Sequence, residues 1–103
     1  MRLSQKRHKF RRMKRMLNAY GEFLGYNVVE DQGKRCDDCP NTHPRSVHKV
    51  GLAIDLILYD DEWEPIWFTI DFEKLHDFWD FIGGAERITG DLGHFSLEHG
   101  GVR

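Results

Sequence analysis

The chain has 103 residues, the length of one small domain with one modest hydrophobic core. Hydrophobic residues make up 40% of it and charged residues 31%, a composition that excludes disordered and collagen-like chains. No apolar run approaches the ~20 residues of a membrane-spanning helix, and two cysteines are too few for a disulfide scaffold. We therefore expect a single domain over residues 1–103.

The net charge of −2 conceals an asymmetry along the chain. Residues 1–16 hold eight Lys and Arg and no acid, whereas the remainder holds seven Lys and Arg and all 17 acids. A basic segment on an acidic body indicates an anionic partner, such as nucleic acid, anionic lipid or a cell-wall polymer. Alternatively, the basic residues form a solvated helix face that folds against the acidic body.

Residues 4–24 form the first predicted helix. Its apolar residues recur at spacings of three and four, which is the pattern of one helix face turned to a core: Phe10, Met13, Leu17, Tyr20 and Leu24. We expect Ser4 to cap the start of this helix and Gly25 to follow its end. No apolar stretch of 7–15 residues follows the basic start, so we expect no secretory signal.

Three segments then read as strands. A short strand over 26–29 is followed by a loop over 31–47 and by the clearest strand of the chain, 52–59. In that strand four residues point one way, namely Leu52, Ile54, Leu56 and Leu58. Residues 66–69 are expected to pair back on it as a hairpin. Trp63 and Trp67 flank the turn, where they either line a cleft or pack within the hairpin.

The second predicted helix begins with Asp71 as its N-cap and ends at Gly83-Gly84. Its buried stripe is expected to consist of Phe72, Leu75, Trp79 and Ile82, with His76 beside it in a structural role. The last strand is expected over 94–98. This order of elements predicts the α+β class, with an antiparallel sheet and two main helices.

Asp55 interrupts an otherwise apolar strand, where an unpaired carboxylate costs several kcal/mol. An arginine partner is one solution, and a bound metal ion is the other. His48 precedes Gly51, which lets the chain turn tightly into the strand, and His94 begins the last strand. Two histidines and a strand aspartate are typical of a three-ligand zinc site with an open fourth position, here placed on the sheet.

Two motifs around these residues resemble a known family. SVHKVGLAIDL at 46–56 fits the pattern S-x-H-x-x-G-x-A-x-D-L, and DLGHF at 91–95 fits D/E-x-x-H-F. Together they resemble the VanY-type zinc peptidases, which include D-alanyl-D-alanine carboxypeptidases, D,D-dipeptidases and phage L-alanyl-D-glutamate endolysins. The likeness extends over roughly residues 44–103, and the ending over 94–103 is most similar to the short phage-encoded members.

The resemblance implies a role for each matching residue. It makes His48, Asp55 and His94 the zinc ligands and Asp91 the general base. Many members carry Glu at the position of Asp91. Several phage-type members resemble this sequence in carrying Asp there.

The resemblance also implies residues that bind substrate. Ser46 occupies the position of a serine that helps to hold it. The upstream Tyr-Arg-Ser element of many relatives is absent, and Arg35 or Arg45 would replace its arginine in steadying the substrate carbonyl.

The implied function is a zinc-dependent peptidase that cleaves a peptide bond in the stem of bacterial peptidoglycan, as a phage or prophage endolysin. L-Ala–D-Glu, D-Ala–D-Ala and cross-bridge bonds all remain candidates. The enzyme would be a monomer without a specific nucleic-acid partner, made in the host cytoplasm without a signal peptide and acting on the wall in the periplasm. The alternative is a non-catalytic module that binds cell wall or nucleic acid through the basic helix.

Two further features of the sequence bear on metal binding. Cys36 and Cys39 have the C-x-x-C spacing of a zinc knuckle, but a structural site needs four ligands and no second pair follows. A local disulfide or two thiols in a loop are the other interpretations. Glu98 shares a face with His94 and Ser96 by strand alternation, so we expect it to hydrogen-bond a metal ligand without binding the metal itself.

Overall fold

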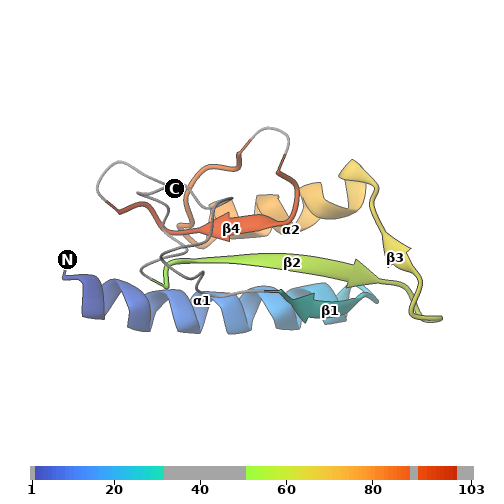
Figure 1. Ribbon diagram of the computed structural model, residues 1–103, viewed down its shortest axis with the longest axis horizontal. Coiled ribbons are helices and arrows are strands. Elements are labelled where there is room, and N and C mark those ends of the chain that lie inside the picture. The colour runs from blue at the N-terminus through green and yellow to red at the C-terminus, as the bar shows by residue number, and fades with distance from the viewer. Residues whose placement is uncertain (1, 32–50, 89–90, 100–103) are drawn as a thin grey trace, which may run out of the picture.

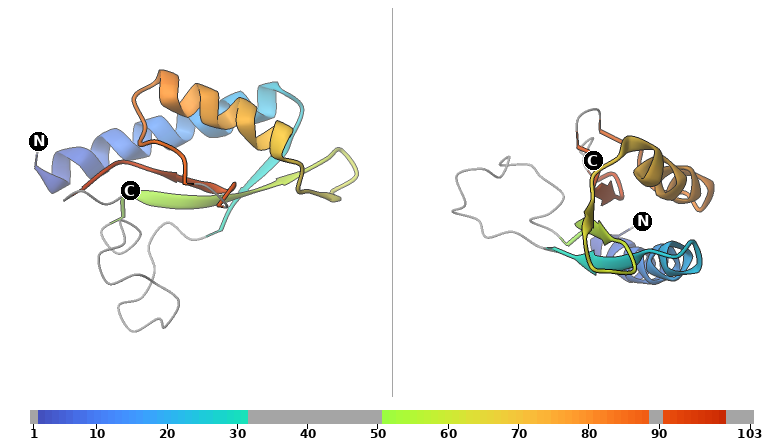
Figure 2. Two further views of the ribbon diagram at one scale, coloured as in Figure 1. Left: turned by 90° about the horizontal axis from the view of Figure 1, so that it is seen from above. Right: turned by 90° about the vertical axis from the view of Figure 1, so that its right-hand side faces the viewer.

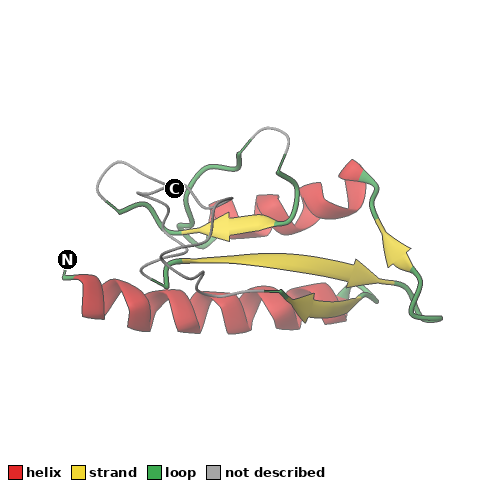
Figure 3. Ribbon diagram, viewed as in Figure 1, coloured by secondary structure: helices red, strands yellow, loops and turns green. Residues whose placement is uncertain are grey.

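The computed structural model describes residues 2–31, 51–88 and 91–99 (Figure 1). In this part of the chain two helices and four strands follow one another in the order α1 (Leu3–Phe23), β1 (Asn27–Glu30), β2 (Ala53–Tyr59), β3 (Pro65–Ile66), α2 (Thr69–Phe81) and β4 (His94–Ser96). Both helices lie on the same face of an antiparallel sheet (Figures 2 and 3). The predicted α+β class is therefore confirmed.

β2 is the centre of the sheet, and every other strand pairs with it in antiparallel register. β1 runs along one edge, where Asn27 lies opposite Tyr59. The other edge is shared: β4 pairs with the start of β2, through Ala53 to Asp55, and β3 pairs with its end. The sheet edge therefore has a gap between β4 and β3.

The core lies between the sheet and the two helices. The four leucine and isoleucine residues that alternate over 52–58, in β2 and just before it, are all buried, as the sequence predicted. The buried residues of the helices pack against them, namely Phe10, Met13 and Leu17 of α1 and Phe72, Leu75 and Trp79 of α2. The Trp79 ring makes edge-to-face contacts with Phe10 and Phe95, at centroid distances of 5.8 and 5.9 Å, which join both helices to β4.

The ends of α1 correct one prediction and confirm another. The helix begins at Leu3, so Ser4 lies inside its first turn and is not the N-cap. Instead, the Gln5 side chain reaches back and accepts the Arg2 backbone N–H at 2.9 Å. Gly25 follows the C-cap residue Leu24 with a φ of +100°, the left-handed conformation that glycine adopts most readily.

α2 begins three residues earlier than the sequence predicted, because its N-cap is Phe68 and not Asp71. β3 covers only Pro65–Ile66, and Thr69, predicted to lie in a strand, is the first residue of the helix. Asp71 is therefore not the N-cap but lies in the first turn, where its carboxylate accepts the Tyr26 hydroxyl. Burial, followed by the contact with Asp71, raises the pKa of Tyr26 to about 12.

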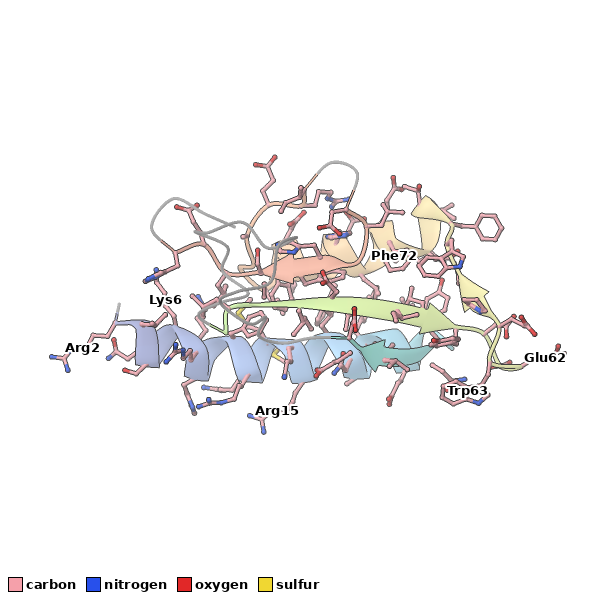
Figure 4. The ribbon with its side chains drawn as sticks, in the orientation of Figure 1. Arg2, Lys6, Arg15, Glu62, Trp63 and Phe72 are labelled. Atoms are coloured by element: carbon pink, nitrogen blue, oxygen red, sulfur yellow. The ribbon has the colours of Figure 1, made fainter. Side chains whose placement is uncertain are left out.

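The basic face of α1 is only partly used by the fold. Lys14 pairs with Glu30 at 3.3 Å, and the Lys6 ammonium donates to the Glu98 carbonyl at 3.1 Å. Arg2 and Arg15 instead point away from the body (Figure 4). No helix in the described ranges is both long and apolar enough to cross a membrane.

Candidate metal centre

Asp55 and His94 lie directly opposite each other across the β2–β4 ladder. Their neighbours Ile54 and Phe95 form the next pair, which belongs to the core. Because side chains alternate along a strand, Asp55 and His94 share the face that is turned away from the helices. Only 17% of the Asp55 side chain and 5% of the His94 side chain is exposed.

A tight turn before β4 brings Asp91 to the same place. The His94 backbone N–H donates to the Asp91 carbonyl at 3.3 Å, and the Leu56 N–H donates to the Gly93 carbonyl at 2.8 Å. The turn therefore lies directly against β2. A Cβ atom at residue 93 would stand 2.7 Å from the Leu56 carbonyl oxygen, closer than real contacts allow, so only glycine fits there.

The three side chains form a group that could hold a metal ion. One ligand atom from each of Asp55, Asp91 and His94 lies within 4.8 Å of the others. The His94 Nδ1 atom is 3.8 Å from an Asp55 carboxylate oxygen and 3.9 Å from an Asp91 oxygen, distances too long for hydrogen bonds. Ligand atoms around a tetrahedral zinc ion stand about 3.4 Å apart, since each bond is about 2.1 Å. A small inward movement of the carboxylates would therefore bring them to coordination distance.

The two carboxylates differ in exposure. Asp55 is largely covered, whereas 53% of the Asp91 side chain is exposed. Asp91 is thus the member of the group that meets solvent, and Asp55 is the member held within the sheet.

The metal group is supported from the helix side by two residues of α2. The buried His76 ring stacks on Phe95 at a centroid distance of 4.2 Å, and its Nε2 lies 2.7 Å from the Leu92 carbonyl oxygen. The Trp79 indole N–H donates to the Ser96 carbonyl at 2.9 Å. These bonds fix the backbone on both sides of His94.

His76 acts as a hydrogen-bond donor in this position. A carbonyl oxygen only accepts, so the His76 Nε2 must carry the proton that it donates to Leu92. Burial is the main cause that lowers the pKa of His76, which favours the neutral form. The sequence predicted a structural role for His76 but gave no sign of this partner.

The other predicted site residues have different outcomes. His48, Ser46, Arg35 and Arg45 lie outside the described residues, as do Cys36 and Cys39. Glu98 is exposed and follows the end of β4 at Ser96, so strand alternation does not carry it to the metal group.

A cavity of about 420 Å³ opens beside Asp55 and Asp91. Trp67 and Phe72 contribute to its wall, and so does Asp31, which follows β1. Of the two tryptophans at the hairpin, Trp67 thus lines a cleft, as one of the two interpretations expected. The sequence did not predict a role for Asp31, because it stands at the start of a polar loop with no motif around it.

No protein-family model matches the chain, and no curated protein matches it. The chemistry of the site therefore follows from its own donors, one imidazole and two carboxylates. Nitrogen and oxygen donors of these kinds bind zinc and other divalent transition metals.

Proposed function

We propose that the chain is a zinc-dependent peptidase of the VanY type, which cleaves a peptide bond in the stem peptide of bacterial peptidoglycan. One observation carries most of the support. Asp55 and His94, two of the three ligands that the resemblance implies, face each other on the sheet, and Asp91, the implied base, lies within 4.8 Å of both. Asp55 of the first motif thus lies beside Asp91 and His94 of the second, although the two motifs are far apart in the sequence.

In this proposal Asp55 and His94 hold zinc together with His48, whose role rests on the resemblance alone. When bound, zinc supplies a Lewis acid that polarises the scissile carbonyl and lowers the pKa of a water molecule to about 7. The covered position of Asp55 suits a ligand, because water has little access to compete for its carboxylate.

Asp91 is the general base of the proposal. Its carboxylate is about half exposed and lines the cavity, so it reaches both water and a bound peptide. It would accept a proton from the attacking water and return it to the departing amine. The same geometry would also allow Asp91 to act as a ligand, and the Asp91→Ala variant below separates the two roles.

The substrate-binding roles of Ser46 and of Arg35 or Arg45 remain predictions. So does the assignment to a phage or prophage endolysin. The exposed cations of α1, which include Arg2 and Arg15, suit an encounter with an anionic wall.

The test is digestion of purified peptidoglycan, with the fragments identified by mass spectrometry and the zinc content measured by elemental analysis. We expect cleavage of one type of stem-peptide bond, which stops when a chelator removes the metal and returns when zinc is restored. Full activity of metal-free protein would contradict the proposal.

A zinc-loaded protein that binds peptidoglycan without cutting it would instead support the non-catalytic wall-binding alternative. The exposed basic face of α1 is the observation that favours that alternative.

A further inference from the structure

The cavity beside the metal group lies at the gap in the sheet edge between β4 and β3. Leu56 and Ile57 line it, at the point where the pairing of β2 with β4 has ended and the pairing with β3 has not begun. Its volume of about 420 Å³ falls within the range of small-ligand sites. Because Asp55 and Asp91 form part of its lining, whatever occupies the cavity lies next to the metal group.

Most of the cavity wall away from the metal group is apolar. Ile57, Trp67, Phe72 and Leu92 contribute to it. Trp67 is 67% exposed, an unusual state for a tryptophan, so its ring remains available for contact. Such a wall suits an alkyl chain, since burying it releases water from both surfaces.

Asp31 adds a carboxylate to this apolar wall. Its backbone N–H donates to the Asp55 carbonyl at 2.8 Å, which continues the β1–β2 ladder by one residue. Asp31, Asp55 and His94 therefore form a row across three strands, with Asp31 on the edge opposite His94. Asp31 does not belong to the metal group, and within the described ranges no Lys, Arg or His forms an ion pair with it.

We propose that this cavity binds a basic side chain of the substrate and that Asp31 is the residue that selects it. An alkyl stem would lie along Ile57 and Trp67, and its terminal ammonium would pair with the Asp31 carboxylate. Long amine side chains bury their methylene groups in this manner while their charge stays at the rim. The inference rests on the proposed function for its peptide substrate, and it adds a specificity: stem peptides that carry a diamino acid near the cleaved bond.

The experiment compares two stem peptides that differ at one side chain. One contains lysine, and the other contains norleucine, which keeps the alkyl stem but lacks the ammonium group. We expect wild-type protein to cleave the lysine peptide with a kcat/KM about fivefold higher, the effect of one partly exposed ion pair. In Asp31→Asn, which keeps the shape of the side chain, the preference should disappear.

Glu30→Gln is the matched control. Glu30 is the adjacent acid, but its carboxylate is paired with Lys14 and Asn18 of α1. This variant should keep the lysine preference. An unchanged preference in Asp31→Asn, or no preference in wild-type protein, would overturn the proposal.

The cavity can also be tested if neither peptide is cleaved, an outcome that would refute the proposed function alone. Binding of the same two peptides is then followed by the NMR shifts of the Ile57 and Gly93 amides. A fivefold tighter binding of the lysine peptide that depends on Asp31 would support the cavity's role. Equal binding of the two peptides, or no binding of either, would overturn it.

Discussion

Two buried histidines lie on opposite sides of β4, and their surroundings differ. His76 comes from the helix side, where it donates to the Leu92 carbonyl and stacks on Phe95. His94 lies on the other side, with Nδ1 facing two carboxylates at 3.8 and 3.9 Å. Burial is nearly the same, at 2% and 5% exposure. The partners of a buried histidine, rather than its burial, thus indicate whether it serves the fold or a site.

The comparison also shows how the helix side serves the metal group. The Leu92 carbonyl that His76 holds belongs to the turn between Asp91 and His94. If the hydrogen bond from His76 to Leu92 were lost, the backbone could shift at Asp91, which precedes Leu92, and at His94, which follows Gly93. The packing of α2 on one side of the sheet therefore helps to position the Asp91 carboxylate, which faces solvent on the other side.

Among the substitutions considered, Asp91→Ala in the metal group should have the largest effect on the rate of hydrolysis. If Asp91 is the general base, this variant should keep its zinc and its fold while the rate of peptidoglycan hydrolysis falls about 10²–10⁴-fold. Elemental analysis beside a hydrolysis assay measures both. Glu98→Ala, which removes an exposed acid on the other side of His94, serves as the control and should retain its rate. Loss of zinc from Asp91→Ala would make Asp91 a ligand, and an unchanged rate would remove it from the mechanism.

Gly93→Ala tests the turn that joins the two sides. Its Cβ would overlap the Leu56 carbonyl oxygen, so the turn must move away from β2. We expect a loss of about 1–3 kcal/mol in the free energy of unfolding, as for other overpacked sites. A displacement of about 1 Å at a reacting group can cost about 10²-fold in rate. The rate of hydrolysis should therefore fall even under conditions where the variant is fully folded. Wild-type stability together with a wild-type rate would show that the close approach is unimportant.

The smallest expected effect concerns the charge of His76. Its folded-state pKa lies below the ordinary value of 6.5, because burial disfavours the charged ring. As pH falls below 6.5, the unfolded chain binds a proton at His76 before the folded chain does. The free energy of unfolding therefore decreases between pH 6.5 and the folded-state pKa. Above pH 6.5 His76 leaves it unchanged. His76→Gln keeps an N–H donor but does not titrate.

The His76 prediction is checked by comparing melting temperatures at pH 7.5 and 5.5. The decrease should be larger in wild-type protein than in His76→Gln, since the two proteins differ in no other side chain. Equal decreases in the two proteins would show that His76 does not carry this pH dependence.

Much of the fold could be predicted from periodicity. The alternation of β2 and the stripes of both helices depend on burial, which the spacing of apolar residues records directly. The start of α2 was not predicted because Phe68, Thr69 and Ile70 have side chains typical of strands, although all three are exposed in the structure. The N-terminus of α1 was missed because Gln5, three residues after Arg2, replaces the expected serine cap.

The candidate site was predictable only where a motif marked it. Asp55 was conspicuous as an acid in an apolar strand, and DLGHF placed Asp91 near His94. Asp31 and the contact of His76 with Leu92 depend on strand register and helix packing, which bring together residues distant in the sequence. No local pattern records such contacts.

The most direct test of the metal centre is the zinc content of two matched variants, His94→Gln and His76→Gln, after dialysis against buffer without metal. Wild-type protein and His76→Gln should each retain about one zinc per chain. His94→Gln should retain little, while its circular dichroism stays that of the folded protein. A folded His94→Gln that keeps a full equivalent of zinc would contradict the account, because the metal would then be bound elsewhere in the chain.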